Sequence, residues 1–243
     1  MRIGILSDIH GNLPALQAVL SGLRGDAVDL YLCLGDVALV GPQPSECLDV
    51  LRQLSPGVFI LGNTDVYIYE PPAPKEIVTR RDRWVMELIH WTQERLRAEQ
   101  IEWIRGFVRT HTVDLGGGPA LLAYHASPGN LEGVIKADTP EEDLARLFDG
   151  WDAPLCIGGH THLPLLRRWE GRTLLNPGST GATFRKDEKH IRPPWAEYAV
   201  LDATGGRLDI SFRRAPLDLE AVRRAAAQSG MPGGEDWAAA WGE

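Results

Sequence analysis

Short apolar runs alternate with helical segments through the first sixty residues, and this alternation limits the fold more than any other feature. Strands are predicted at 2–7, 29–34 and 57–61, and helices at 13–23 and 44–54. Pro14 suits the first turn of the first helix, and Asn12 suits its N-cap. Because strands that alternate with helices favour a parallel sheet, we predict an α/β fold.

The segment 66–110 interrupts this rhythm with a helical pattern rich in Trp and Arg, which predicts an insertion or cap. Further strands are expected at 111–115, 120–125, 154–158, 164–169, 172–175, 197–202 and 207–214, and helices at 139–148 and 217–228. Thr139 is expected to cap the first of these helices. We therefore expect one domain over 1–228, followed by a loose Gly-rich tail over 229–243.

Composition excludes several classes of protein. The net charge of −8 argues against a protein that holds long DNA or RNA. The three cysteines, Cys33, Cys47 and Cys156, form no CxxC motif, which argues against a disulfide framework or a zinc knuckle. Cys33 and Cys156 lie in apolar runs and are expected to be buried thiols. No leader segment or membrane span is seen, so a cytoplasmic location is expected.

Polar side chains with metal-binding chemistry follow the predicted strands, each just past a C-terminal end. These are Asp8, Asp36, Asn63, His125 and His160, with His10 and His162 two residues after the first and last. Such strand ends meet at one edge of an α/β sheet, so these residues are expected to converge. We expect D-x-H and H-x-H to be extended, which would place both ligands on one side. Carboxylate, amide and imidazole ligands suit Mn, Fe, Zn or Ni.

The full set SDIHGN, GD, GNTD, His125, GHTH and NPGS resembles the calcineurin-like metallophosphoesterase superfamily. In particular, it looks like the compact bacterial and archaeal phosphodiesterase branch, and the resemblance covers 1–65 and 111–214. It implies a four-layer α/β/β/α sandwich, a hydrolase that acts on phosphoric ester bonds, and two divalent cations, with Mn²⁺ favoured and Fe, Zn or Ni open.

The resemblance also assigns roles to positions. It implies that Asp8, His10 and His162 hold one metal, that Asn63, His125 and His160 hold the other, and that Asp36 bridges them. In this family a bridging hydroxide attacks phosphorus, so Asp36 and Asn63 count as catalytic.

One position departs from many relatives. Thr64 stands where those proteins carry a His that protonates the leaving group. Asp65 is a candidate catalytic acid if burial raises its pKa, but it could equally cap the segment that follows. Without a general acid, substrates with good leaving groups are expected.

Candidate substrate residues are less well defined. Asn12 and Arg185 are candidates for substrate binding, although a solvated surface charge is the stronger interpretation of Arg185. The insertion could be a lid, with Trp84 or Tyr67 stacking on a base and three arginines gripping phosphate: Arg80, Arg81 and Arg83. The competing and preferred interpretation is an amphipathic helix pair whose Trp residues pack inward.

The loop NPGSTG is expected to be shaped by local hydrogen bonds from Asn176 and Ser179. Taken together, the sequence predicts a metal-dependent phosphohydrolase for phosphodiesters or nucleotides. Its partner is a small phosphoester, without membrane or stable nucleic acid, and self-association is left open. Two alternatives stay open: a non-catalytic scaffold of the same fold, and a nuclease on polymeric DNA.

Overall fold

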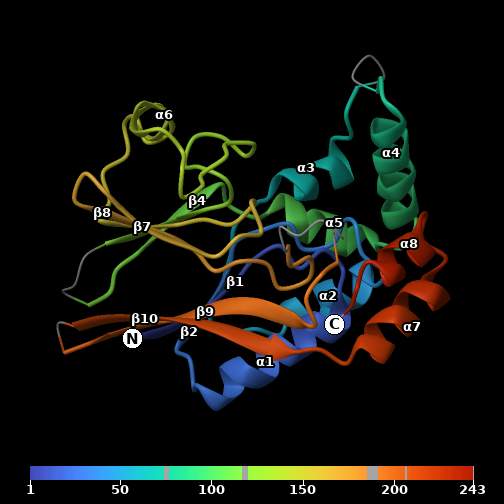
Figure 1. Ribbon diagram of the computed structural model, residues 1–243, viewed down its shortest axis with the longest axis horizontal. Helices are drawn as coiled ribbons and strands as arrows, with labels where there is room; N and C mark the ends of the chain where they lie inside the picture. The colour runs from blue at the N-terminus through green and yellow to red at the C-terminus, as the bar shows by residue number, and fades with distance from the viewer. Residues whose placement is uncertain (74–76, 117–119, 185–190, 206, 243) are drawn as a thin grey trace.

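Two five-stranded sheets stack face to face in the computed structural model (Figure 1), which describes residues 1–73, 77–116, 120–184, 191–205 and 207–242. The strand order is β10-β9-β1-β2-β3 in the first sheet and β4-β5-β6-β8-β7 in the second. Helices cover the outer faces of both sheets (Figure 1). The four-layer α/β/β/α sandwich that the sequence predicts is therefore confirmed.

The first sheet holds the β-α-β units at the start of the chain. Its strands are β1 (Arg2–Leu6), β2 (Leu30–Cys33), β3 (Gly57–Phe59), β9 (Trp195–Thr204) and β10 (Arg207–Pro216). The first three are parallel, and β9 and β10 join antiparallel on the other side of β1. The crossover helices are α1 (Leu13–Gly25) and α2 (Pro44–Leu51). Asn12 caps α1 as predicted, because its side chain accepts a hydrogen bond from Ala15 N at 3.3 Å.

The second sheet is built from the later strands. These are β4 (Thr110–Val113), β5 (Leu121–Tyr124), β6 (Leu155–Ile157), β7 (Leu165–Trp169) and β8 (Arg172–Asn176). Its outer face is covered by α6 (Glu141–Leu147) through Leu144 and Phe148. The predicted cap Thr139 is wrong by one residue: Pro140 precedes the first helical residue, and the Thr139 hydroxyl instead accepts from Lys136 N at 2.7 Å.

A layer of buried apolar side chains joins the two sheets. The first sheet contributes Ile3, Ile5, Leu32 and Leu34, and the second contributes Leu121, Ala123, Leu155 and Ile157. All are buried, and burial of a side chain of Leu or Ile size contributes about 1.5–3 kcal/mol. This layer fixes how the strand ends of one sheet lie against those of the other.

The remaining helices gather at one end of the sandwich (Figure 1): α3 (Asn63–Tyr69), α4 (Arg80–Gln93), α5 (Ala98–Arg105), α7 (Leu219–Ser229) and α8 (Gly234–Ala239). The packing interpretation of the insertion agrees with α4, where Leu88 and Trp91 are buried. Trp84 packs in the same cluster, and its indole N–H donates to Pro232 O at 3.3 Å. No helix in the described part of the chain is long and apolar enough to cross a membrane.

The C-terminal segment differs from the loose tail that its glycines predict. It forms α8, and Trp237 and Trp241 are only 6% and 1% exposed. Both pack against the apolar sides of α4 and α7, which would otherwise face water. The two tryptophans therefore close a small core of their own, beside the main sandwich.

Candidate metal centre

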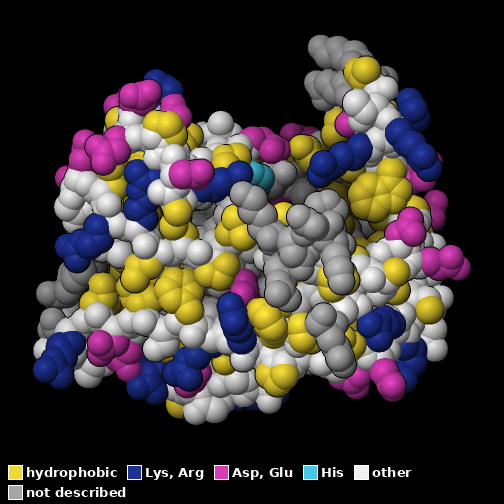
Figure 2. Space-filling model, viewed as in Figure 1, with side chains coloured by type: hydrophobic (Ala, Val, Ile, Leu, Met, Phe, Trp, Pro, Cys, Tyr) yellow, Lys and Arg dark blue, Asp and Glu magenta, His cyan; other side chains and the backbone are white. Residues whose placement is uncertain are grey.

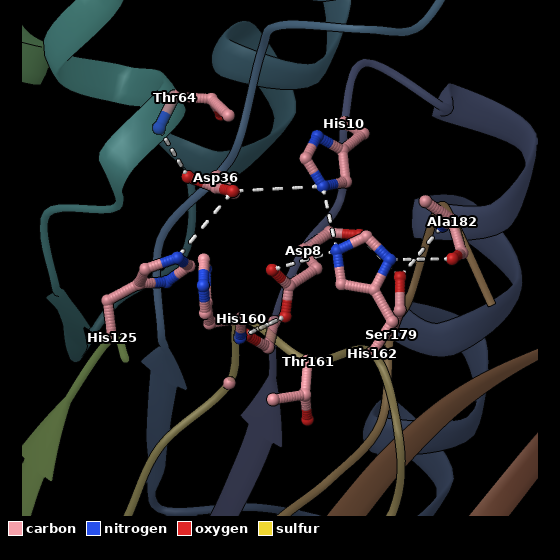
Figure 3. Close-up of polar contacts among 12 residues, drawn as sticks. Asp8, His10, Asp36, Thr64, His125, His160, Thr161, His162, Ser179 and Ala182 are labelled. Carbon is pink, nitrogen blue, oxygen red and sulfur yellow. Dashed lines mark hydrogen bonds and ion pairs between the residues drawn. The ribbon is translucent and has the colours of Figure 1, made fainter. Parts of the chain in front are cut away.

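The residues predicted as metal ligands meet at one edge of the sandwich (Figure 3). Asp8 follows β1 and Asp36 follows β2, whereas His125 and His160 follow β5 and β6 of the other sheet. Asn63 follows β3 and is the first residue of α3. Parallel strands end at the same edge, and the stacking of the sheets brings the two edges together.

The backbone at these positions is left-handed rather than extended, which corrects the expected geometry of D-x-H and H-x-H. Positive φ angles between 48° and 68° occur at five of the seven positions: Asp8, His10, Asp36, His160 and His162. For a residue with a Cβ this conformation costs of order 1–3 kcal/mol. The chain thus turns sharply after each strand and directs successive side chains of these motifs into one space. The packing of the sandwich offsets the energetic cost of this backbone conformation.

His10 and His162 lie with their Nε2 atoms 3.1 Å apart (Figure 3). The Nδ1 atom of His10 is 2.9 Å from Leu39 O, and that of His162 is 2.8 Å from Ala182 O. A carbonyl can only accept, so each Nδ1 carries the proton. In the neutral rings two Nε2 lone pairs then face each other, an arrangement that a cation between them would stabilise.

Asp8 is the third residue of this group. Its Oδ2 atom accepts from Ser7 Oγ at 2.6 Å and from His160 N at 3.1 Å. Its Oδ1 atom is fully buried without a hydrogen-bond donor and lies 3.3 Å from His162 Nε2. Buried carboxylate oxygens are almost always paired, so this atom is available to a cation.

Asp36 lies between the two groups of histidines (Figure 3). Its Oδ2 atom is 3.8 Å from His10 Nε2 and 3.6 Å from His125 Nε2. Its Oδ1 atom accepts the backbone N–H of Thr64 at 2.9 Å, which fixes the orientation of the carboxylate. A carboxylate in this position has one oxygen directed towards both groups, as a bridging ligand requires.

The second group surrounds His125. Its Nδ1 atom is 2.6 Å from Leu34 O, and this contact directs Nε2 towards the centre, where it lies 3.0 Å from Asn63 Oδ1. The ring of His160 lies 5.2 Å from that of His125, centroid to centroid. The ligand atoms of Asp8, Asp36 and His125 all lie within 4.8 Å of one another, so Asp8 is within reach of both groups.

Burial and charge set the protonation of the histidines before a cation binds. Burial lowers the pKa of His10 to about 4 and also lowers the pKa of His160. Burial also acts to lower the pKa of His162, but the adjacent Asp8 carboxylate outweighs it, so the pKa of His162 is raised. Burial is likewise outweighed at His125, whose pKa is raised by Asp36 and Asp8. The carboxylates therefore attract positive charge to both groups of histidines, as protons or as metal ions.

Asp65 holds the two adjacent loops together. Its Oδ2 atom accepts from Asp36 N at 2.8 Å and from Gly62 N at 3.0 Å, and its Oδ1 atom accepts from Val37 N at 2.9 Å. Gly62 is required at this point, since a Cβ there would collide with Asp36. The side chain caps α3, as one of the two sequence interpretations expects, and each printed contact of its carboxylate is that of an acceptor. Burial and the adjacent Asp36 carboxylate raise the pKa of Asp65 to about 7, which is the condition that the catalytic-acid interpretation requires.

The other candidates lie as follows. Asn12 is fully buried and donates to Gly181 O at 3.0 Å, so both ends of its amide are used within the fold rather than for substrate. Arg185 falls outside the described residues. Asn176 donates to Gly159 O at 2.6 Å, and Ser179 donates to Asp8 O at 2.8 Å. Asn176 Oδ1 also accepts from Gly178 N at 2.9 Å, and Ser179 Oγ accepts from Ala182 N at 2.8 Å, and these two local hydrogen bonds shape the loop as predicted.

The donor set fits divalent cations. It contains carboxylate and amide oxygens and imidazole nitrogens, and the three histidines whose Nε2 faces the group are each tied through Nδ1 to a backbone carbonyl. The orphaned Asp8 oxygen and the facing imidazoles leave space that a positive charge would fill. The sequence analysis missed Glu132, whose carboxylate accepts from Tyr67 OH at 3.0 Å at the rim of this centre.

Comparison with known proteins agrees with the fold and the motifs. The chain belongs to the calcineurin-like phosphoesterase superfamily, because the model of that superfamily's domain matches residues 1–205. A curated relative is an uncharacterized protein of Methanocaldococcus jannaschii, which is 25% identical over 221 residues, 86% of this chain and 85% of that protein.

Two solved structures cover nearly the whole chain. A metallophosphoesterase from Sphaerobacter thermophilus is 27% identical with a TM-score of 0.75, and the match covers 99% of this chain and 98% of that one. A hypothetical protein from Pyrococcus horikoshii has a TM-score of 0.79 at 21% identity, over 97% of this chain and 96% of the other. The first similarity extends the match to the residues after 205, and the second shows the shared fold.

Proposed function

We propose that this protein is a metal-dependent phosphohydrolase that acts on phosphodiesters or nucleotides and holds two divalent cations, with Mn²⁺ favoured. The observation that carries the proposal is the buried Asp8 Oδ1 atom, which has no donor and lies beside two imidazole nitrogens that face each other. Membership of a family of metal-dependent phosphoesterases supports the same chemistry.

The ligands divide into two groups with Asp36 between them. One group is Asp8, His10 and His162, and the other is Asn63, His125 and His160. When bound, two adjacent divalent cations would lower the pKa of a water and offset charge on a phosphoryl oxygen. The chain itself fixes the ligands through backbone carbonyls and N–H groups, so little reorganisation is needed when substrate binds.

Proton delivery to the leaving group is the part of the reaction that the chain supports least. Thr64 uses its backbone N–H to hold Asp36, and the carboxylate of Asp65 accepts three backbone N–H groups. We therefore assign Asp65 as a positioning residue. It follows that aryl phosphodiesters, whose leaving groups need no proton, are expected to react much faster than alkyl phosphodiesters. Comparable rates on the two would contradict this assignment.

Two substitutions test the centre. Asp36→Asn and His160→Ala are each expected to reduce turnover of bis(p-nitrophenyl) phosphate at least about 100-fold and to lower the bound metal. His111→Ala, at an exposed site on β4, is the matched control and is expected to change neither. Activity is measured with added Mn²⁺, metal by elemental analysis, and folding by circular dichroism.

Two outcomes would refute the proposal. Near-normal activity of either ligand variant with Mn²⁺ would show that the residues are assigned wrongly. A wild-type protein that binds no metal after Mn²⁺ addition would instead favour the non-catalytic scaffold.

A further inference from the structure

A cavity of about 580 Å³ lies between the end of α3 and the first half of α4. It is separate from the ligand set and is lined mainly by Pro71, Pro72, Ile77, Val85 and Met86, with Tyr67 as one wall. Its volume falls within the range of about 300–1,000 Å³ that is usual for small-molecule sites. Tyr67, Val85 and Met86 line the cavity and also pack against the apolar cluster around Leu88 and Trp91, so the cavity borders the cluster that joins α4 to α7 and α8.

Tyr67 connects this cavity with the metal centre. It lies one helical turn after Asn63 on α3, which places the two side chains on the same face of that helix. Its hydroxyl also donates to Glu132 on the opposite rim at 3.0 Å. One side chain therefore separates the cavity from a proposed metal ligand.

The space-filling view agrees with this placement. Figure 2 shows the face of the molecule hollowed between the parts that carry α6 and α4, with a histidine visible in the hollow. The hollow thus lies between a histidine and the part of the molecule that carries α4 (Figure 2).

The chemistry of the lining favours an uncharged occupant. Apolar side chains and the Tyr67 ring line one part of the wall, and the polar part, which is nearly as large, includes Glu70, Arg81 and Asp82. Of its charged residues, Arg81 is offset by Glu70 and Asp82, and Glu132 adds a further carboxylate beside Tyr67. A second phosphate would therefore meet more negative than positive charge, whereas a flat organic ring would be buried against apolar atoms.

We propose that this cavity binds the neutral organic group of a phosphodiester, an aryl or nucleoside group, while the phosphoryl group lies at the metal centre. The inference rests on the proposed function, because it takes the phosphoryl group to bind beside Asn63. The insertion would thus recognise the organic group of the substrate. Tyr67 would form a wall shared by the cavity and the phosphoryl subsite.

The affinities of product-like ligands test whether the cavity binds a nucleoside group. They do not depend on which group leaves during hydrolysis. Binding of methyl phosphate, thymidine 5′-phosphate and thymidine 3′,5′-bisphosphate to the Mn²⁺-loaded protein is measured by calorimetry. We expect thymidine 5′-phosphate to bind about tenfold or more tightly than methyl phosphate, and the added 3′-phosphate to bring no further gain.

Filling the cavity is expected to remove that preference. Met86→Trp and Ile77→Trp each place a bulky ring in the cavity, and two variants guard against misfolding of one of them. Both are expected to weaken thymidine 5′-phosphate about tenfold while methyl phosphate binds as before. Glu87→Trp, exposed on the same helix and outside the cavity, is the matched control and is expected to change neither affinity.

The possible failures are distinguishable. If bis(p-nitrophenyl) phosphate is hydrolysed but thymidine 5′-phosphate binds no better than methyl phosphate, or folded cavity variants bind it normally, the subsite is refuted and the proposed function stands. If the bisphosphate binds more tightly than the monophosphate, the neutral character of the site is wrong. If neither turnover nor methyl phosphate binding is found, the proposed function itself fails.

Discussion

Replacing Asp65 with asparagine tests how the metal centre is held together. The carboxylate accepts three backbone N–H groups, from Asp36 and Val37 on one loop and from Gly62 on the other. An amide oxygen has two lone pairs, so asparagine can keep at most two of these bonds, and its NH₂ group then faces the third N–H. The substitution keeps the shape of the side chain and removes an acceptor where water cannot replace it.

The expected cost follows from these contacts. A buried N–H without an acceptor costs about 1–3 kcal/mol, and each of the two remaining bonds weakens by about 1 kcal/mol when the acceptor loses its charge. Removing a buried negative charge beside Asp36 offsets part of this loss. We expect the free energy of unfolding to fall by about 2–3 kcal/mol, and the affinity for metal to fall with it, because the Asp36 backbone is no longer fixed. Asp65→Ala loses all three bonds and is expected to be less stable still.

Urea denaturation in the presence of EDTA measures this effect without a contribution from metal, at a pH well above 7 where the Asp65 carboxylate, whose pKa is raised to about 7, is ionised. Asp82→Asn is the control, since Asp82 caps α4 in a similar way by accepting from Val78 N and Thr79 N, but at the surface where water can substitute. The loss at Asp82 is expected to be clearly smaller. If Asp65→Asn keeps wild-type stability and metal affinity but loses turnover, Asp65 is a proton donor and the positioning role is refuted.

Three further predictions concern the metal centre. In EDTA, His162→Ala is expected to be about 1 kcal/mol less stable than His162→Gly, because the left-handed backbone at this position penalises a Cβ; the reverse order would contradict the strain argument. Mn²⁺ affinity is expected to fall as the pH decreases through the pKa of His162, which is raised above its ordinary value of 6.5, since the proton competes for the same nitrogen; a flat calorimetric profile would refute this. Mn²⁺ is expected to raise the melting temperature of the wild type but not of Asp8→Asn, and equal shifts would exclude Asp8 as a ligand.

The strands and the polar residues that meet at their ends could be predicted because both follow from local patterns in the sequence. An apolar run followed at once by Asp, Asn or His marks a strand end, and strand ends of parallel sheets converge whatever the details of the loops. Hence Asp8, Asp36 and His125 were located from sequence, and the structure brings them within 4.8 Å of one another.

Features that depend on distant contacts could not be predicted. The left-handed turn at His10 is held by its hydrogen bond to Leu39 and by the packing of the loops, whereas the sequence of the motif alone is compatible with an extended segment. The role of Asp65 depends on N–H groups 28 and 29 residues earlier in the chain. Trp241 lies in a Gly-rich segment, and only the exposed apolar sides of α4 and α7 explain why it is buried.

The division of the ligands between two sheets has a consequence for folding. Asp8 and Asp36 leave one sheet and His125 and His160 leave the other, so the complete centre forms only after the sheets have docked. Free energy from cation binding is then gained late on the folding path, after its transition state. Bound metal is therefore expected to slow unfolding while refolding proceeds at nearly the same rate with or without it. The cations would therefore stabilise the folded protein kinetically, although the two sheets fold and dock without them.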